Sequence, residues 1–106
     1  MMTSLTQSAL SGYLLVSGIL LTIGIVGFLV RRNLIVMFLC TELMLQGAAL
    51  AFVAVGRYLL DYSGQVMVIF ILTVAAAEAA IALALVVLLY RQKQTLDADA
   101  YMELRE

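Results

Sequence analysis

Two acidic residues lie deep inside apolar stretches of the sequence. Glu78 occurs in TVAAAEAAIAL, Thr73 to Leu83, and no other acidic or basic residue lies between Asp61 and Arg91. Glu42 occurs in the similarly apolar stretch FLCTELMLQGAAL. Withdrawal from water favours the protonated form of a carboxyl group, so a carboxylate in such surroundings can take up and release a proton. This pattern is typical of a proton relay inside a membrane.

The composition indicates that lipid surrounds most of this chain, and it excludes several classes of function. The chain has 106 residues, is 65% hydrophobic and 12% charged, and has a mean hydropathy of +1.12. A soluble domain of this size has too little interior to bury so much apolar surface. The net charge of −1 gives no electrostatic case for binding nucleic acid. One cysteine, Cys40, excludes a multi-cysteine metal or iron–sulfur site, and the absence of histidine argues against a haem or zinc site.

Three apolar segments are long enough to cross a hydrocarbon core of about 30 Å as helices. They comprise residues 13–30, 34–55 and 66–90. The short connections, 31–33 and 56–65, favour antiparallel neighbours. We therefore predict an all-α membrane protein in which residues 1–106 form a single membrane domain with three transmembrane helices and a short polar tail, 91–106. The first segment is interpreted as a retained span, because its positive charges follow it instead of preceding it.

The distribution of basic residues predicts the orientation of these spans. With three spans, the 31–33 connection and the tail share one side of the membrane. That side holds five of the six basic residues: Arg31, Arg32, Arg91, Lys93 and Arg105. The opposite side holds only Arg57. The N-terminus is therefore expected outside, in the periplasm, and the C-terminus in the cytoplasm.

The two carboxylates are predicted to lie at the same depth. Glu42 is nine residues past Asn33 and Glu78 is twelve before Tyr90, which correspond to depths of about 14 and 18 Å. A charged side chain there costs at least about 2.5–3.5 kcal/mol on insertion scales. Our hypothesis is that both residues exchange protons. Gln46 shares a helix face with Glu42 and could hold a water molecule beside it.

Other interpretations of these residues remain open. Each Glu could instead be a structural hydrogen-bonding group or pair with a lysine of another chain. Arg31 and Arg32 could be topology anchors or a contact at the cytoplasmic mouth of a proton path. Small residues predict close helix packing, in which other chains would complete the site; they are Ser17, Gly24 and Gly27 on the first span and Ala76, Ala80 and Ala84 on the third.

The segments RRNLIVMFLCTELMLQGAALAFV and GQVMVIFILTVAAAEAAIALAL resemble the K-subunit family of proton-translocating NADH–quinone oxidoreductase, respiratory complex I. The likeness extends from Gly24 to Tyr90, and the family often has Asn at Gln46 and Gly at Ala82. The resemblance implies that Glu42 and Glu78 are the family's two membrane carboxylates. It also implies that the paired arginines form the family's functional cytoplasmic loop.

The resemblance further implies a multi-pass subunit of the inner (plasma) membrane of a bacterium. It would contact lipid and pack all three helices against other membrane subunits of the complex. Those and other subunits would supply the sites for NADH, FMN, iron–sulfur clusters and quinone, while this chain couples electron transfer to proton translocation. Two alternatives remain: a small subunit of a multisubunit cation/proton antiporter, and an assembly subunit without a proton-transfer role. A drug/proton exporter is disfavoured, because the first span has no charge.

Overall fold

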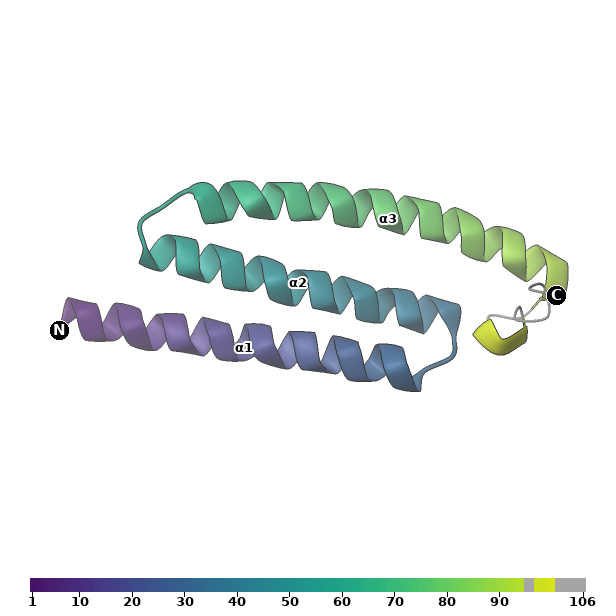
Figure 1. The fold of residues 1–106 in the computed structure, drawn as a ribbon, viewed down its shortest axis with the longest axis horizontal. Helices are drawn as coiled ribbons and strands as arrows, with labels where there is room; N and C mark the ends of the chain where they lie inside the picture. The colour runs from purple at the N-terminus through teal and green to yellow at the C-terminus, as the bar shows by residue number, and fades with distance from the viewer. Residues whose placement is uncertain (95–96, 101–106) are drawn as a thin grey trace.

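The computed structural model describes residues 1–94 and 97–100 and contains three long helices. They are α1 (Met2–Val30), α2 (Leu34–Tyr58) and α3 (Ser63–Lys93). Figure 1 shows that they run antiparallel in chain order, within overall extents of 61 × 25 × 20 Å. Each helix is long and apolar enough to cross a membrane. The prediction of an all-α chain with three such helices is confirmed.

The helices contain the three predicted spans and continue beyond them. α1 begins eleven residues before the predicted span, at Met2. This extension is polar, and its hydroxyl groups donate to carbonyls of the preceding turn, as Thr6 Oγ1 does to Met2 O at 3.1 Å. Only part of a helix need lie in lipid, so the boundaries of the membrane segments themselves remain a prediction.

The predicted tail is described in part. Residues 91–93 belong to the last turn of α3, and residues 98–100 form a short 3₁₀ turn. Residues 95–96 and 101–106, which include Arg105, lie outside the described residues.

Short turns join the helices. Asn33 Oδ1 accepts hydrogen bonds from the backbone N–H groups of Ile35 (2.9 Å) and Val36 (3.4 Å), so Asn33 caps the start of α2. In the turn between α2 and α3, Asp61 Oδ1 accepts a hydrogen bond from the backbone N–H of Ser63 at 3.0 Å. Hydrogen bonds from the Ser63 backbone and then from its side chain hold the pKa of Asp61 below its ordinary value. Asp61 is therefore ionised at neutral pH and stabilises the start of α3.

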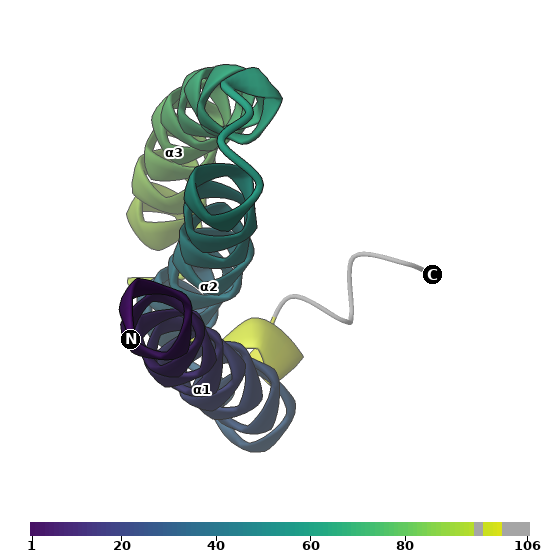
Figure 2. The same ribbon diagram turned by 90° about the vertical axis from the view of Figure 1, so that its left-hand side faces the viewer.

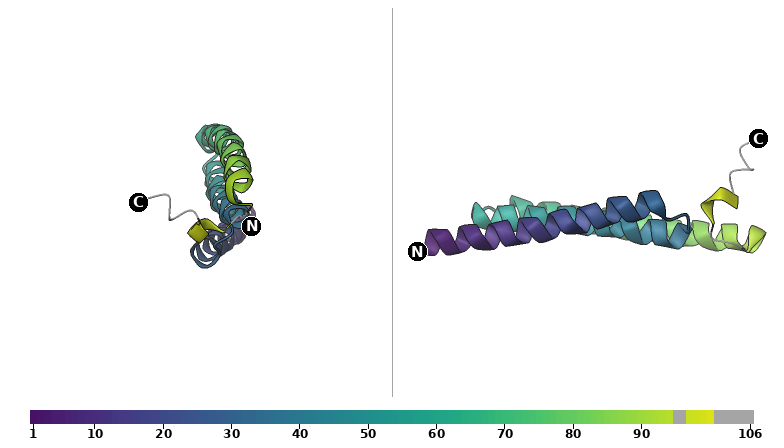
Figure 3. Two further views of the ribbon diagram at one scale, coloured as in Figure 1. Left: turned by 90° about the vertical axis from the view of Figure 1, so that its right-hand side faces the viewer. Right: turned by 90° about the horizontal axis from the view of Figure 1, so that it is seen from below.

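The three helices form a row with α2 in the middle, as the end-on view in Figure 2 shows. α2 packs against both neighbours, whereas α1 and α3 make at most marginal contact with each other in the described part of the chain. The view from below in Figure 3 shows α1 inclined across α2. Buried apolar residues are correspondingly few and small: Cys40, Ala49, Ala54, Ala75 and Ala82. The large aliphatic side chains point outward, where only lipid or other chains can cover them.

α1 and α2 approach each other at backbone distance because small residues line their interface. A Cβ atom on Gly47 would lie 2.9 Å from Ser17 O and 3.1 Å from Leu21 N. A Cβ atom on Gly24 would lie 2.8 Å from Cys40 O. Ser17 Oγ also donates a hydrogen bond to Gly47 O at 2.5 Å. The small-residue stripe predicted on the first span therefore packs against α2.

α2 and α3 meet closely beside the turn that joins them. A Cβ atom on Gly56 would lie 3.2 Å from Gly64 Cα, and one on Gly64 would collide with Phe52 O. The two glycines thus face each other across the turn. Their contact sets the register in which the rest of α3 runs back along α2.

Candidate functional site

The register of α2 and α3 places Glu42 and Glu78 at the same level. Glu42 precedes Gly56 by 14 residues, and Glu78 follows Gly64 by 14 residues. Because Gly56 and Gly64 are in contact and the helices are antiparallel, both glutamates lie about 21 Å from that contact along the helices. The two residues therefore lie at one level along the helix pair, and their common depth in a membrane stays a prediction.

Glu42 is half-buried on α2. Gln46, one turn further on, is exposed, and the adjacent Gly47 is buried against α1. Glu42 and Gln46 form no hydrogen bond with each other among the described residues. The Gln46 amide is therefore available to a water molecule or to another chain, and its role in hydration remains a prediction.

Glu78 is exposed at the edge of the α3 face that packs against α2. Ala75 and Ala82, three residues before it and four after it, are both buried. The predicted small-residue row on α3 lies on the open part of the helix, since Ala76, Ala80 and Ala84 are all exposed. A carboxylate that faces hydrocarbon is energetically costly, so this exposure is compatible with contact to water or to another chain.

Neither carboxylate has a polar partner within residues 1–94 and 97–100. The structure contains no hydrogen bond or ion pair to Glu42 or Glu78 in that part of the chain. The sequence has no Lys or Arg between Arg32 and Arg57, or between Arg57 and Arg91. Any polar partner of either carboxyl group must therefore come from water, from another chain or from outside the described residues.

The two arginines of the α1–α2 turn have different surroundings. The guanidinium of Arg32 forms an ion pair with the carboxylate of Asp99 in the tail. The side chain of Arg31 is exposed and has no ion-pair partner in the part of the chain that the structure describes. Sequence reasoning did not single out Asp99. The available signal was the pair of aspartates, Asp97 and Asp99, in a tail of mixed charge at the same end of the predicted spans as the arginine turn.

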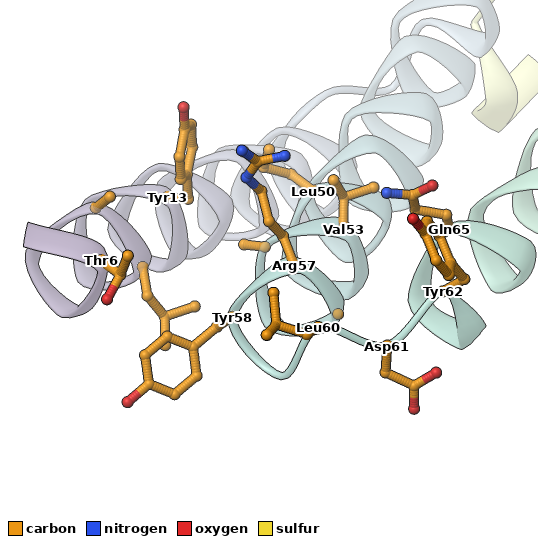
Figure 4. A pocket seen from close by; sticks show the side chains of 14 residues that line it. Thr6, Tyr13, Leu50, Val53, Arg57, Tyr58, Leu60, Asp61, Tyr62 and Gln65 are labelled. Atoms are coloured by element: carbon orange, nitrogen blue, oxygen red, sulfur yellow. The ribbon is translucent and has the colours of Figure 1, made fainter. Parts of the chain in front are cut away.

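Neither carboxylate lines either of two hollows in the described part of the chain, although Thr41 and Ala82, close to them in sequence, line the second. One of about 860 Å³ surrounds the α2–α3 turn and is drawn in Figure 4. There the Asp61 carboxylate points away from the Arg57 guanidinium, and the two form no ion pair among the described residues. A second, apolar hollow of about 220 Å³ lies near the other end of the helices, between Phe38 and Leu85. The described residues also contain no group of three His, Cys, Asp or Glu placed to hold a metal ion.

Comparisons with known proteins agree with the resemblance noted from the sequence. Residues 12–106 match the family model for NADH-ubiquinone/plastoquinone oxidoreductase chain 4L. A relative from Nitrosospira multiformis, named NADH-quinone oxidoreductase subunit K, is 53% identical over 87% of this chain and 90% of its own length. The subunit K of Persephonella marina is 48% identical over 88% of this chain and 93% of its own length. A relative from Geotalea uraniireducens, named NADH-quinone oxidoreductase subunit K 2, is also 48% identical, over 86% of this chain and 91% of its own length. The chain therefore belongs to the NADH-ubiquinone/plastoquinone oxidoreductase chain 4L family.

Proposed function

We propose that this chain is the K-type subunit in the membrane arm of a bacterial NADH–quinone oxidoreductase, and that Glu42 and Glu78 transfer protons at mid-membrane. The main support is their common level on two adjacent antiparallel helices that contain no basic residue in their apolar parts. Relatives named NADH-quinone oxidoreductase subunit K, matched over 90% and 93% of their own length, support the assignment to the complex.

The proton-transfer role follows from the chemistry of an isolated carboxyl group. A protonated carboxyl group donates a hydrogen bond, and its ionised form accepts one, so each Glu can pass a proton to water or to a neighbouring group. Glu42 is partly covered by its own chain, whereas Glu78 is open to the surroundings. We infer that water and groups from neighbouring subunits connect the two sites, with Gln46 orienting water beside Glu42.

The redox half of the reaction belongs to other subunits in this proposal. NADH, FMN, iron–sulfur clusters and quinone would bind there, since this chain contains one cysteine and no histidine. The apolar outer surfaces of α1 and α3 would contact other membrane subunits and lipid. The concentration of basic residues at one end favours a bacterial plasma-membrane subunit with the N-terminus in the periplasm and the arginine turn and tail in the cytoplasm.

Purification of the chain in mild detergent tests the assignment to the complex. We expect flavin- and iron–sulfur-containing subunits to copurify with it, and NADH to reduce the cofactors of the purified material. Mass spectrometry and the visible absorption spectrum measure this result. Copurification with a set of antiporter subunits that lack flavin would instead support the cation/proton antiporter.

A Glu78→Gln substitution tests the second proton site. Glutamine keeps the shape of the side chain but has no exchangeable carboxyl proton, so we expect NADH-driven proton pumping by membrane vesicles to fall several-fold. NADH oxidation with an artificial acceptor controls for assembly. The matched variant Glu78→Asp keeps a carboxyl group and should retain more pumping than Glu78→Gln. Equal pumping by the wild type and both variants would argue against a proton-transfer role for this residue.

A further inference from the structure

The tail folds back onto the α1–α2 turn. Gln94 ends α3 in the left-handed conformation, with φ 53°, and its backbone N–H donates to Tyr90 O at 2.6 Å. Residues 97–100 lie beside residues 31–33 (Figures 1 and 2).

Backbone and side-chain contacts join the tail to the turn. The backbone N–H of Ala98 donates to Arg32 O at 2.8 Å, and Asn33 and Asp97 form an antiparallel bridge. The carboxylate of Asp99 pairs with the guanidinium of Arg32. The Lys93 ammonium group donates to Ala100 O at 2.6 Å and ties the tail to the end of α3. We call residues 31–33 and 97–100 together the cytoplasmic clasp.

The clasp connects parts of the chain that the helices leave separate. α2 lies between α1 and α3, which make at most marginal contact with each other in the described part. The chain itself connects α1 to α3 only through α2. The contacts of the clasp therefore join the end of α3 directly to the turn that follows α1. The backbone N–H of Asp99 also donates to Asp97 Oδ1 at 3.0 Å, which shapes the tail for this contact.

We propose that Asp99 is a positioning residue that holds Arg32 in the clasp and leaves Arg31 as the cation that the turn presents to a partner or to the proton path. The two adjacent arginines then have different tasks. Arg32 is neutralised within its own chain, and Arg31 is exposed and unpaired in the described part. The consequence for pumping rests on the proposed function, whereas the clasp itself can be tested independently.

A disulfide trap tests the clasp in the assembled complex. Directly opposed residues of an antiparallel bridge have Cα atoms about 4.5–5.5 Å apart, which lies within the range a disulfide spans. In a Cys40→Ala background, we expect Asn33→Cys/Asp97→Cys to form a disulfide under mild oxidation, measured as the loss of maleimide-reactive thiol. The control pair Asn33→Cys/Leu59→Cys spans the length of α2 and should not react. Failure of the first pair to form the bond would overturn the clasp.

The same trap measures the contribution of Asp99. Exposed ion pairs contribute modestly, so Asp99→Asn should slow disulfide formation about two- to five-fold. Asp99→Glu keeps the charge and should restore most of the rate. Equal rates in the parent, Asp99→Asn and Asp99→Glu proteins would show that the carboxylate does not hold the tail, which would refute its positioning role.

Combined substitutions separate positioning from a general structural effect. If Asp99 acts through Arg32, the pumping loss of Asp99→Asn combined with Arg32→Gln should not exceed that of Arg32→Gln alone. Because the proposal makes Arg31 the cation through which Asp99 affects pumping, Asp99→Asn should also add little to the pumping loss of Arg31→Gln. A double variant whose pumping loss is the product of the losses of Asp99→Asn and Arg32→Gln would contradict the proposal. If the Glu variants pump normally, the proposed proton role fails, yet the disulfide trap still tests the clasp.

Discussion

Replacement of Glu42 by glutamine is expected to lower NADH-driven proton pumping by at least about tenfold, because a positioned proton-transfer group commonly contributes about 10²–10⁴-fold to a rate. Glutamine keeps the size and hydrogen-bonding geometry of the side chain but cannot carry the proton. The substitution leaves the contact between Gly47 and Ser17 in place, so α2 should keep its position against α1. Quenching of a pH-sensitive dye in inverted membrane vesicles measures the loss.

The control for Glu42→Gln is NADH oxidation with an artificial acceptor, which should remain near the wild-type rate in an assembled complex. A second variant exchanges the two polar groups on this part of α2: Glu42→Gln with Gln46→Glu moves the carboxyl group by one turn, about 6 Å along the helix. We expect this double variant to pump less than the wild type but more than Glu42→Gln alone. Normal pumping by Glu42→Gln would exclude the residue from the proton path.

Replacement of Gly47 by alanine is expected to destabilise the packing of α1 against α2. The added Cβ atom would lie 2.9 Å from Ser17 O and 3.1 Å from Leu21 N. Both are backbone atoms of a helix, so the two helices must separate to admit the methyl group. Overpacking of this kind costs about 1–3 kcal/mol. Separation also weakens the hydrogen bond from Ser17 to Gly47 O, and such bonds in membranes contribute about 0.6 kcal/mol on average.

The matched control is Gly18→Ala. A Cβ atom on Gly18 meets nothing within 4 Å, so the substitution adds a methyl group to the open face of α1. Heat inactivation of NADH–quinone activity in membranes measures both variants. We expect the inactivation temperature to fall for Gly47→Ala and to change little for Gly18→Ala. Equal inactivation temperatures would show that neighbouring subunits, and not the α1–α2 contact, determine the stability of this region.

The positions of Glu42 and Glu78 along their helices were predictable from the sequence. A helix rises by a constant amount per residue, so counting from Asn33 and Tyr90 yields a depth for each carboxylate. The existence of three long helices was predictable for a related reason, since a backbone in lipid must satisfy its own hydrogen bonds. The helix ends were less predictable: α1 begins at Met2, where polar residues extend the helix beyond its apolar part.

The direction in which each carboxylate faces was decided by packing between helices. Glu42 is half-buried and Glu78 exposed because backbone contacts at Gly47 and Gly64 set how α2 lies against its two neighbours. Periodicity was a weak guide here, since apolar residues surround each helix in a membrane protein and mark no single buried face. Small residues predicted that close contacts would form, but not which backbone atoms they would meet.

Three apolar helices could be predicted from the sequence, because they depend on local composition, and the spacing of the two carboxylates along them follows from a fixed helical rise. The tertiary structure alone decided that α2 lies between α1 and α3, and that Arg32 pairs with Asp99, 67 residues further along the chain. Contacts of that kind depend on how two turns meet in space after the helices have packed. The local sequence around Arg32 or Asp99 does not specify that the two side chains form an ion pair.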